Sequence, residues 1–206
     1  QDCVGAGGLK INQVGSWFSA LRQAVNTKPG LVMWSDVETF EVYQNHYISA
    51  TVDRIIKQME IEQPYVNNYI TFSYCHYQSP NNTDSGFQTT YINFLHTRQL
   101  DSTAPSIPTN FTAVLRDNGD EIKLNWNPST DNIGVCGYYI YRNGILICKK
   151  QVLRKDEGAN FTMPNSFIDK NLKAGTAYSY QVKAYDFANN VSDFTPPVTI
   201  NISQRR

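Results

Sequence analysis

The sequence predicts a two-part protein, in which an α/β half is followed by an all-β half. Three observations lead to this prediction: helix-like and strand-like periodicities alternate over residues 1–98, residues 99–108 (QLDSTAPSIP) have no periodicity, and about seven short strand-like runs fill residues 109–206. We therefore expect an α/β domain, a linker and a β-sandwich domain with these bounds.

Three helices are expected in the first half, each marked by apolar residues at helical spacing. Their buried faces are expected to hold Val14, Phe18, Leu21 and Val25, then Val52, Ile55, Ile56 and Met59, then Phe87, Tyr91, Phe94 and Leu95. The second helix is expected to open at Ser49. The third is expected to open at Ser85, because Ser85 and Gln88 have the spacing of a capping box.

Two strands are expected between these helices, at Leu31–Val37 and Tyr69–Tyr77, and Gln1–Val4 reads as the end of a preceding strand. Helices that alternate with apolar strands indicate a parallel sheet covered by helices. Because two or three strands cannot complete such a sheet, we infer that this half is the C-terminal part of a larger α/β domain.

The second half contains short strands separated by turn residues such as Asn143-Gly144. The expected strands are Phe111–Leu115, Glu121–Asn127, Gly137–Arg142, Ile145–Lys150, Ser166–Asp169, Thr176–Asp186 and Val198–Ile202. This number of strands in about a hundred residues is typical of a β-sandwich.

The composition excludes two classes of partner. The formal net charge is zero and no basic run occurs, so we expect no nucleic-acid binding. No stretch reaches the roughly 18–20 apolar residues of a membrane helix, so no membrane span is expected. Charged residues make up 17% and the chain has 13 Tyr. This composition is typical of extracytoplasmic proteins that handle carbohydrate, so we expect a secreted, periplasmic or cell-surface location.

The four cysteines have no zinc-site spacing, and no metal or other cofactor is expected. If Asn143-Gly144 is a two-residue hairpin loop, Cys148 lies opposite Tyr139, which disfavours a disulfide between Cys148 and Cys136. Buried thiols are expected instead. The stretch Asp117–Asp120 (DNGD) is expected to form a plain turn, because the remaining spacing of a calcium loop is absent.

Residues 105–202 resemble a fibronectin type III domain. The resemblance rests on Pro108, on Leu124-Asn125-Trp126, on GYYIYRNG at 137–144 and on LKAGTAYSYQVKAYD at 172–186. It implies that Trp126 is the core tryptophan and that Tyr178 is the corner tyrosine, which hydrogen-bonds back toward Leu172. It also implies a spacer or docking role beside a catalytic domain.

The first half resembles an uncharacterised bacterial family of glycosidase-like TIM barrels, (β/α)8, which are frequently followed by fibronectin type III modules. The resemblance rests on WSDVETFE at 34–41, QMEIEQPYV at 58–66 and ITFSYCHYQSP at 70–80. It implies that the strands are numbers six, seven and eight of a barrel, with five units upstream.

The end of the Leu31–Val37 strand is the predicted active-site position, because active sites of such barrels lie at the C-terminal ends of the strands. Alternation places Trp34, Asp36 and Glu38 on the side facing the mouth. Resemblance to clan A glycosidases implies that Glu38 is the nucleophile, with Asp36 as a supporting carboxylate and the acid/base on an absent strand. The alternative for both residues is a structural role at the rim.

Four further residues are predicted to bind the sugar. Trp34 offers a flat aromatic platform or packs in the barrel core. Asp2 ends strand six. His76 and Tyr77 end strand eight and either line the pocket or anchor a loop. Two more acids, Glu60 and Glu62, are expected to be structural or solvated.

These observations predict part of a secreted glycoside hydrolase that acts on poly- or oligosaccharide, with the sandwich as spacer or docking unit. The alternatives are a non-catalytic carbohydrate-binding protein and a structural interaction unit. We expect the 206-residue chain alone to be inactive. Its open strand edges would require the missing barrel part or self-association as a partner.

Overall fold

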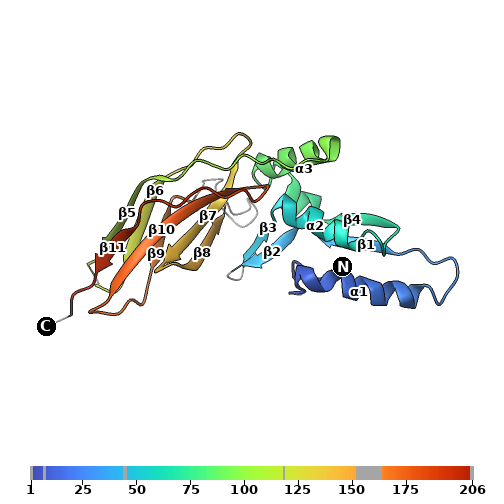
Figure 1. Cartoon of the computed structure of the whole chain (residues 1–206), viewed down its shortest axis with the longest axis horizontal. Helices are drawn as coiled ribbons and strands as arrows, with labels where there is room; N and C mark the ends of the chain where they lie inside the picture. The colour runs from blue at the N-terminus through green and yellow to red at the C-terminus, as the bar shows by residue number, and fades with distance from the viewer. Residues whose placement is uncertain (1, 7, 44–45, 118, 152–163, 205–206) are drawn as a thin grey trace. The chain divides into compact units, whose positions relative to one another are not determined.

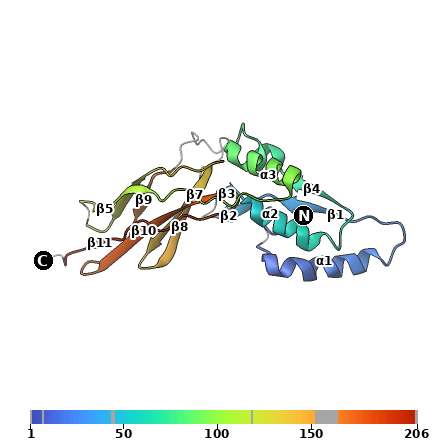
Figure 2. The ribbon, with the colours of Figure 1, turned by 45° about the horizontal axis from the view of Figure 1, so that its top comes forward.

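The computed structural model describes residues 2–6, 8–43, 46–117, 119–151 and 164–204 and is drawn in Figures 1 and 2. The chain divides into two compact units between Leu100 and Asp101. This division falls inside the segment 99–108 that the sequence marks as a linker.

Within its described residues, the first unit contains three α-helices, four strands and one π-helical turn, which Figure 1 labels. In chain order they are α1 (Ile11–Val25), β1 (Trp34–Glu38), β2 (Phe40–Tyr43), β3 (His46–Ser49), α2 (Val52–Glu62), β4 (Asn68–Phe72), η1 (Tyr74–Gln78) and α3 (Ser85–Thr97). Strands β1 and β4 pair in parallel, and β2 and β3 form an antiparallel hairpin. Among the described residues the parallel sheet has two strands, so the barrel stays a prediction.

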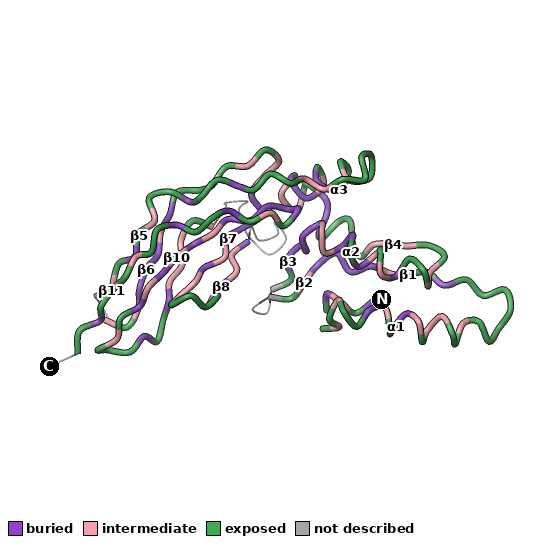
Figure 3. Tube along the Cα trace, in the orientation of Figure 1, coloured by how far each residue is buried: buried purple, intermediate pink, exposed green. Residues whose placement is uncertain are grey.

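The two faces of β1 differ in exposure, and Figure 3 colours the chain by how far each residue is buried. Met33, Ser35 and Val37 are 9%, 2% and 0% exposed, which places them against the helices as expected. On the opposite face, Trp34 is 54% exposed, and its neighbours on β4, Ile70 and Phe72, are 51% and 40% exposed. One face of the parallel pair is therefore open.

The expected helix starts are wrong by one to three residues. Ser49 is the last residue of β3, and its hydroxyl donates to the Tyr77 carbonyl at 2.9 Å. Helix α2 begins at Val52 instead. Helix α3 is capped by Asp84, whose carboxylate accepts from the Gly86 N–H at 2.8 Å, so Ser85 is its first residue and not its cap.

The helix faces are partly as expected. Val14, Phe18, Val52, Ile55, Ile56 and Phe87 are buried, Leu21, Val25, Met59, Tyr91 and Phe94 are half-buried, and Leu95 is 45% exposed. On α2 and α3, fewer residues are therefore fully buried than the apolar patterns of these helices predict.

The strand expected at Tyr69–Tyr77 is also too long. Strand β4 ends at Phe72, and a π-helical turn follows, closed by a hydrogen bond from the Ser79 N–H to the Tyr74 carbonyl at 2.8 Å. His76 and Tyr77 are therefore not at the end of a strand. Aromatic strand propensity fails here because the Tyr77 ring packs into the unit, stacked on Phe40 at 4.7 Å between ring centroids.

The second unit is a sandwich of two antiparallel sheets (Figure 1). Its strands are β5 (Thr109–Leu115), β6 (Ile122–Asn127), β7 (Val135–Arg142), β8 (Ile145–Gln151), β9 (Ser166–Asp169), β10 (Ala177–Asp186) and β11 (Val198–Asn201). The sheets have the orders β5-β6-β9 and β11-β10-β7-β8. Every strand expected in this half is present, which confirms the immunoglobulin-like sandwich.

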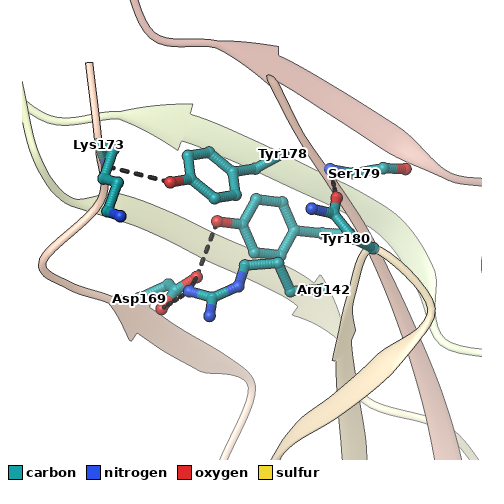
Figure 4. A network of polar contacts seen from close by, with 7 residues as sticks. Arg142, Asp169, Lys173, Tyr178, Ser179 and Tyr180 are labelled. Carbon is teal, nitrogen blue, oxygen red and sulfur yellow. Dashed lines mark hydrogen bonds and ion pairs between the residues drawn. The ribbon is translucent and has the colours of Figure 1, made fainter. Parts of the chain in front are cut away.

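The core of the sandwich confirms both residues assigned by resemblance. Trp126 is 3% exposed and meets the Tyr138 ring edge-on at 5.2 Å between centroids. The Tyr178 hydroxyl accepts a hydrogen bond of 3.0 Å from the Lys173 N–H, which closes the tyrosine corner (Figure 4).

A partly buried ion pair links the two sheets near this corner. Arg142 Nη1 on β7 lies 2.9 Å from Asp169 Oδ2 on β9. The Tyr180 hydroxyl on β10 donates to the same oxygen at 2.8 Å (Figure 4). The carboxylate of Asp169 therefore holds side chains from both neighbouring strands of the opposite sheet.

The predicted register of the β7–β8 hairpin is wrong by one residue. Cys148 lies opposite Ile140 and not Tyr139, because a β-bulge follows Ile140. Cys136 and Cys148 are buried thiols as expected, whereas Cys3 and Cys75 are exposed thiols. Gln1, in the expected first strand end, and Asn118, in the expected turn Asp117–Asp120, lie outside the described residues.

Candidate functional site

Glu38 lies at the end of β1 and is 1% exposed. Its Oε2 accepts a 2.8 Å hydrogen bond from the Ala6 N–H, so the segment around Gly5 and Ala6 covers it. A Cβ at Gly5 would lie 2.5 Å from the Phe40 carbonyl oxygen and 3.0 Å from Glu38 Oε2. Only glycine allows the chain to approach the carboxylate this closely.

Asp36 and Trp34 lie on the uncovered face of the parallel pair. In the β1–β4 register Asp36 is opposite Ile70, and Glu38 is opposite Phe72. We call Trp34, Asp36, Ile70 and Phe72 the open face. It presents two aromatic rings, one aliphatic side chain and one half-buried carboxylate.

Asp2 is wholly buried beside β1. Its N–H donates to the Asp36 carbonyl at 3.2 Å, and its Oδ2 accepts from the Glu38 N–H at 3.1 Å. The Gln58 side-chain amide also donates to Oδ2. Burial raises the pKa of the Asp2 carboxyl to about 6, and the negative charge of Glu38 adds to the rise.

Helix α2 directs a row of polar side chains into the first unit. Arg54, Gln58 and Glu62 follow one another at four-residue intervals, so they lie on one helix face. Arg54 donates to the Gln58 side-chain oxygen and, through Nη2, to the Phe40 carbonyl at 2.7 Å. Gln58 thus connects Arg54 to Asp2.

Glu62 is the least satisfied member of this row. It is 0% exposed, and neither of its carboxylate oxygens has a hydrogen-bond partner among the described residues. Burial raises the pKa of Glu62 to about 7, and the charge of Asp2 contributes. Of the two alternatives expected for these acids, the burial of Glu62 leaves the structural one, whereas Glu60 is exposed.

Sequence reasoning missed Arg54, Gln58 and Glu62 as members of one group. Their four-residue spacing was the available signal. Apolar periodicity alone defines the expected buried face of the helix, and a row of polar residues does not contribute to that pattern. We call Asp2, Glu38, Arg54, Gln58 and Glu62 the buried acid cluster.

His76 and Tyr77 belong to the π-helical turn that follows β4. His76 is exposed, and its Nδ1 lies 2.7 Å from the Ser73 hydroxyl. Tyr77 is 6% exposed and lies beneath the β2–β3 hairpin, where its ring stacks on Phe40. The hydrogen bonds that tie Asp2 to Glu38 do not include either residue.

A groove of about 430 Å³ lies between α2 and α3. None of the predicted site residues lines it; the lining residues are Ile56, Met59, Glu60, Gln63, Tyr69, Tyr91, Phe94, Leu95 and Arg98.

The first unit therefore combines an exposed aromatic face with a cluster of buried carboxyl groups. The open face provides aromatic rings, which suit the C–H face of a sugar. Within the buried acid cluster, Asp2 and Glu62 have a raised pKa, so these two carboxyl groups can hold a proton near neutral pH, as a general acid requires. No helix among the described residues combines the length and apolar character needed to cross a bilayer.

Comparison with known families assigns the two units separately. Residues 1–84 match a family described as a domain of unknown function, DUF4434. Residues 106–201 match the fibronectin type III domain.

Related proteins of named activity share part of the chain. An α-amylase of Niallia circulans is 41% identical over 99 residues, 48% of this chain and 7% of the amylase. A chitinase of Paenibacillus xylanexedens is 34% identical over 104 residues, 50% of this chain and 17% of the chitinase. Exoglucanase B of Cellulomonas fimi is 36% identical over 100 residues, 48% of this chain and 8% of that enzyme. The chain thus spans a small part of each relative.

Proposed function

We propose that this chain is part of a glycoside hydrolase-like protein that acts on poly- or oligosaccharide. The observation that carries the proposal is the open face of β1 and β4, where the exposed Trp34 ring lies on the same face as the Asp36 carboxylate. An aromatic ring binds the apolar face of a sugar, and a carboxylate binds its hydroxyl groups. The amylase, chitinase and exoglucanase relatives support the same substrate class.

Within this proposal the residues have distinct roles. Glu38 is the nucleophile or base, Asp36 supports it, and Trp34, Asp2, His76 and Tyr77 contribute to sugar subsites. Because Glu38 is 1% exposed beneath Ala6, its role requires this segment to move away. Asp36 needs no such movement.

The parallel pairing of β1 and β4 supports a barrel fold for the first unit within this proposal. Strands β1 and β4, with helices against one face, are what two neighbouring units of a (β/α)8 barrel would supply. The remaining units and the second catalytic carboxylate would be upstream. The sandwich acts as spacer or docking unit, and the protein is extracytoplasmic.

A second function is favoured by the burial of Glu38. Its Oε2 is held by the Ala6 N–H at 2.8 Å, which is an ordinary structural use of a carboxylate. In this case the protein binds glycan through the open face without hydrolysing it.

Glu38→Gln in the full-length protein separates the two functions. The matched control is Glu60→Gln, which removes an exposed carboxylate from α2. Hydrolysis of a panel of soluble polysaccharides and glycan binding are both measured. The catalytic proposal predicts that Glu38→Gln loses about 10³-fold or more in kcat with normal binding, while the control is unchanged. Unchanged hydrolysis in Glu38→Gln would refute the nucleophile role, and binding without turnover in the unsubstituted protein would establish the second function.

A further inference from the structure

Three aspartates of the sandwich unit bring their carboxylates together. Asp101 precedes β5, Asp131 lies in the loop between β6 and β7, and Asp186 is the last residue of β10. One carboxylate oxygen of each residue lies within 4.8 Å of the other two. The fold thus assembles this group from three segments that are far apart in the sequence.

Two of the carboxylates are fixed by local hydrogen bonds. Asp131 Oδ1 accepts from the N–H groups of Ile133 and Gly134 at 3.0 and 2.8 Å. Asp186 accepts from Asn190 twice at 2.7 Å, at Oδ1 from the backbone N–H and at Oδ2 from the side-chain amide. Both groups are therefore held in position without a ligand.

Asp101 is tied to the same two loops. Its Oδ1 accepts from the Asn132 side-chain amide at 3.0 Å. Its backbone carbonyl accepts from the Asn190 side-chain amide at 2.9 Å. The segment that leads into β5 is thereby brought against the loop after β6 and the turn after β10.

The remaining oxygens have no partner of their own. Asp101 Oδ2 and Asp131 Oδ2 are completely buried atoms without a hydrogen-bond partner among the described residues, and Asp186 is 2% exposed. No lysine, arginine or histidine within the described ranges forms an ion pair with any of the three. Burial raises the pKa of Asp186 to about 6, and the charges of Asp131 and Asp101 contribute. Buried like charges are costly unless a cation neutralises them.

We propose that Asp101, Asp131 and Asp186 form a calcium site in the sandwich unit. An all-oxygen donor set of carboxylates suits a hard cation and not zinc, which prefers nitrogen and sulfur. Calcium binds oxygen at about 2.3–2.6 Å, so two ligands of one ion can be about 5 Å apart, whereas the limit for magnesium is about 4 Å. Oxygens within 4.8 Å of one another can therefore reach one calcium ion without rearrangement.

The bound ion would fasten the segment before β5 to the loop after β6 and to the end of β10. The sequence predicts no metal site, because the cysteines lack zinc-site spacing and the turn Asp117–Asp120 lacks the remaining spacing of a calcium loop. The proposed site uses none of those residues.

The test uses the 206-residue chain after EDTA treatment and dialysis. Calorimetric titration with CaCl2 is expected to show one ion per chain. At a free calcium concentration about 100-fold above Kd, the Tm of the sandwich unit is expected to rise by about 10 °C. MgCl2 at the same concentration should raise it by less than half as much. No binding and no Tm shift at 10 mM CaCl2 would overturn the site, and an equal shift with MgCl2 would overturn the calcium assignment.

Substitutions of single aspartates test whether the calcium-dependent rise in Tm comes from the proposed site. Asp186→Asn and, separately, Asp101→Asn are expected to abolish the calcium-dependent Tm shift. Asp193→Asn, which alters an exposed aspartate near the same end of the unit, should retain it. Asp101 lies outside the strands, so its variant decides the outcome even if Asp186→Asn does not fold. A full calcium shift in Asp101→Asn would remove Asp101 from the site and contradict the proposal.

Discussion

The backbone N–H of Glu38 donates a hydrogen bond of 3.1 Å to the Oδ2 atom of Asp2, which joins the N-terminal segment to the end of β1. A second hydrogen bond joins the same two segments: the Ala6 N–H donates to Glu38 Oε2. Residues 2–6 are thus positioned by the strand whose terminal carboxylate they cover. Several measurable consequences depend on this arrangement.

Gly5→Ala should destabilise the first unit. The added Cβ would lie 2.5 Å from the Phe40 carbonyl oxygen, which is backbone and cannot turn away. We expect a loss of about 1–3 kcal/mol in the free energy of unfolding, measured by calorimetry. Gly15→Ala is the matched control. Its Cβ would make an ordinary 3.4 Å contact with Ile61 inside α1, so it should stabilise by about 0.5–1 kcal/mol. Equal effects of the two substitutions would contradict the close approach at Gly5.

The stability of the first unit should fall as the pH rises from about 4.5 to about 7, because of Glu62. The unfolded chain releases this proton near the ordinary pKa of 4.5, whereas the folded unit retains it up to about 7. The folded state therefore binds more protons in this window, and its advantage is lost as the pH rises through it. Asp2 acts in the same direction between 3.8 and about 6. Glu62 by itself changes the free energy of unfolding by about 3 kcal/mol over this pH range.

Glu62→Gln should flatten this pH dependence, measured as the free energy of unfolding at a series of pH values. Glu60→Gln alters an exposed residue two positions from Glu62, about 200° around the helix, and should leave the pH dependence unchanged. The groups that face Glu62 are Asp2 and Arg54, with Tyr69 on β4, and they remain in both variants. An identical pH profile for Glu62→Gln and the unsubstituted chain would show that Glu62 is not the responsible group.

Asp169→Asn should destabilise the sandwich unit by about 1–3 kcal/mol. The substitution leaves the half-buried Arg142 guanidinium without its counter-charge and weakens the bond from the Tyr180 hydroxyl. Glu121→Gln is the control, because its partners Arg116 and Lys170 are exposed and such pairs contribute about 0–1 kcal/mol. Urea unfolding of the sandwich unit measures both. A loss below about 1 kcal/mol for Asp169→Asn would show that the pair does not join the sheets.

The sandwich could be predicted closely because its signals are local. Each strand is bounded by its own turn residues, and Asn143 and Gly144 do form the β7–β8 turn with positive φ angles. The bulge after Ile140, which moved Cys148 by one position, has no comparable local mark. Register within a sheet depends on contacts that the sequence of one strand does not contain.

The first unit was harder to predict because its decisive contacts are long-range. Ser49 resembles a helix cap in sequence, but it pairs with Phe40 in the β2–β3 hairpin. Glu41 lies in β2 of the same hairpin. The burial of Glu62 depends on which face of α2 meets the segment around Asp2, and no local pattern specifies that. The three aspartates of the proposed calcium site come together only through the sandwich topology.

The central claim is that the open face binds sugar, and a comparison of two tryptophans tests it most directly. Trp34 on the open face is 54% exposed, and Trp17 on α1 is 47% exposed, so the two substitutions to alanine remove similar exposed rings. In the full-length protein, affinity for a panel of oligosaccharides is measured by calorimetry. We expect Trp34→Ala to weaken binding about 5- to 30-fold, because a stacked ring contributes about 1–2 kcal/mol, and Trp17→Ala to leave it unchanged. Equal affinities for Trp34→Ala and Trp17→Ala would contradict the account.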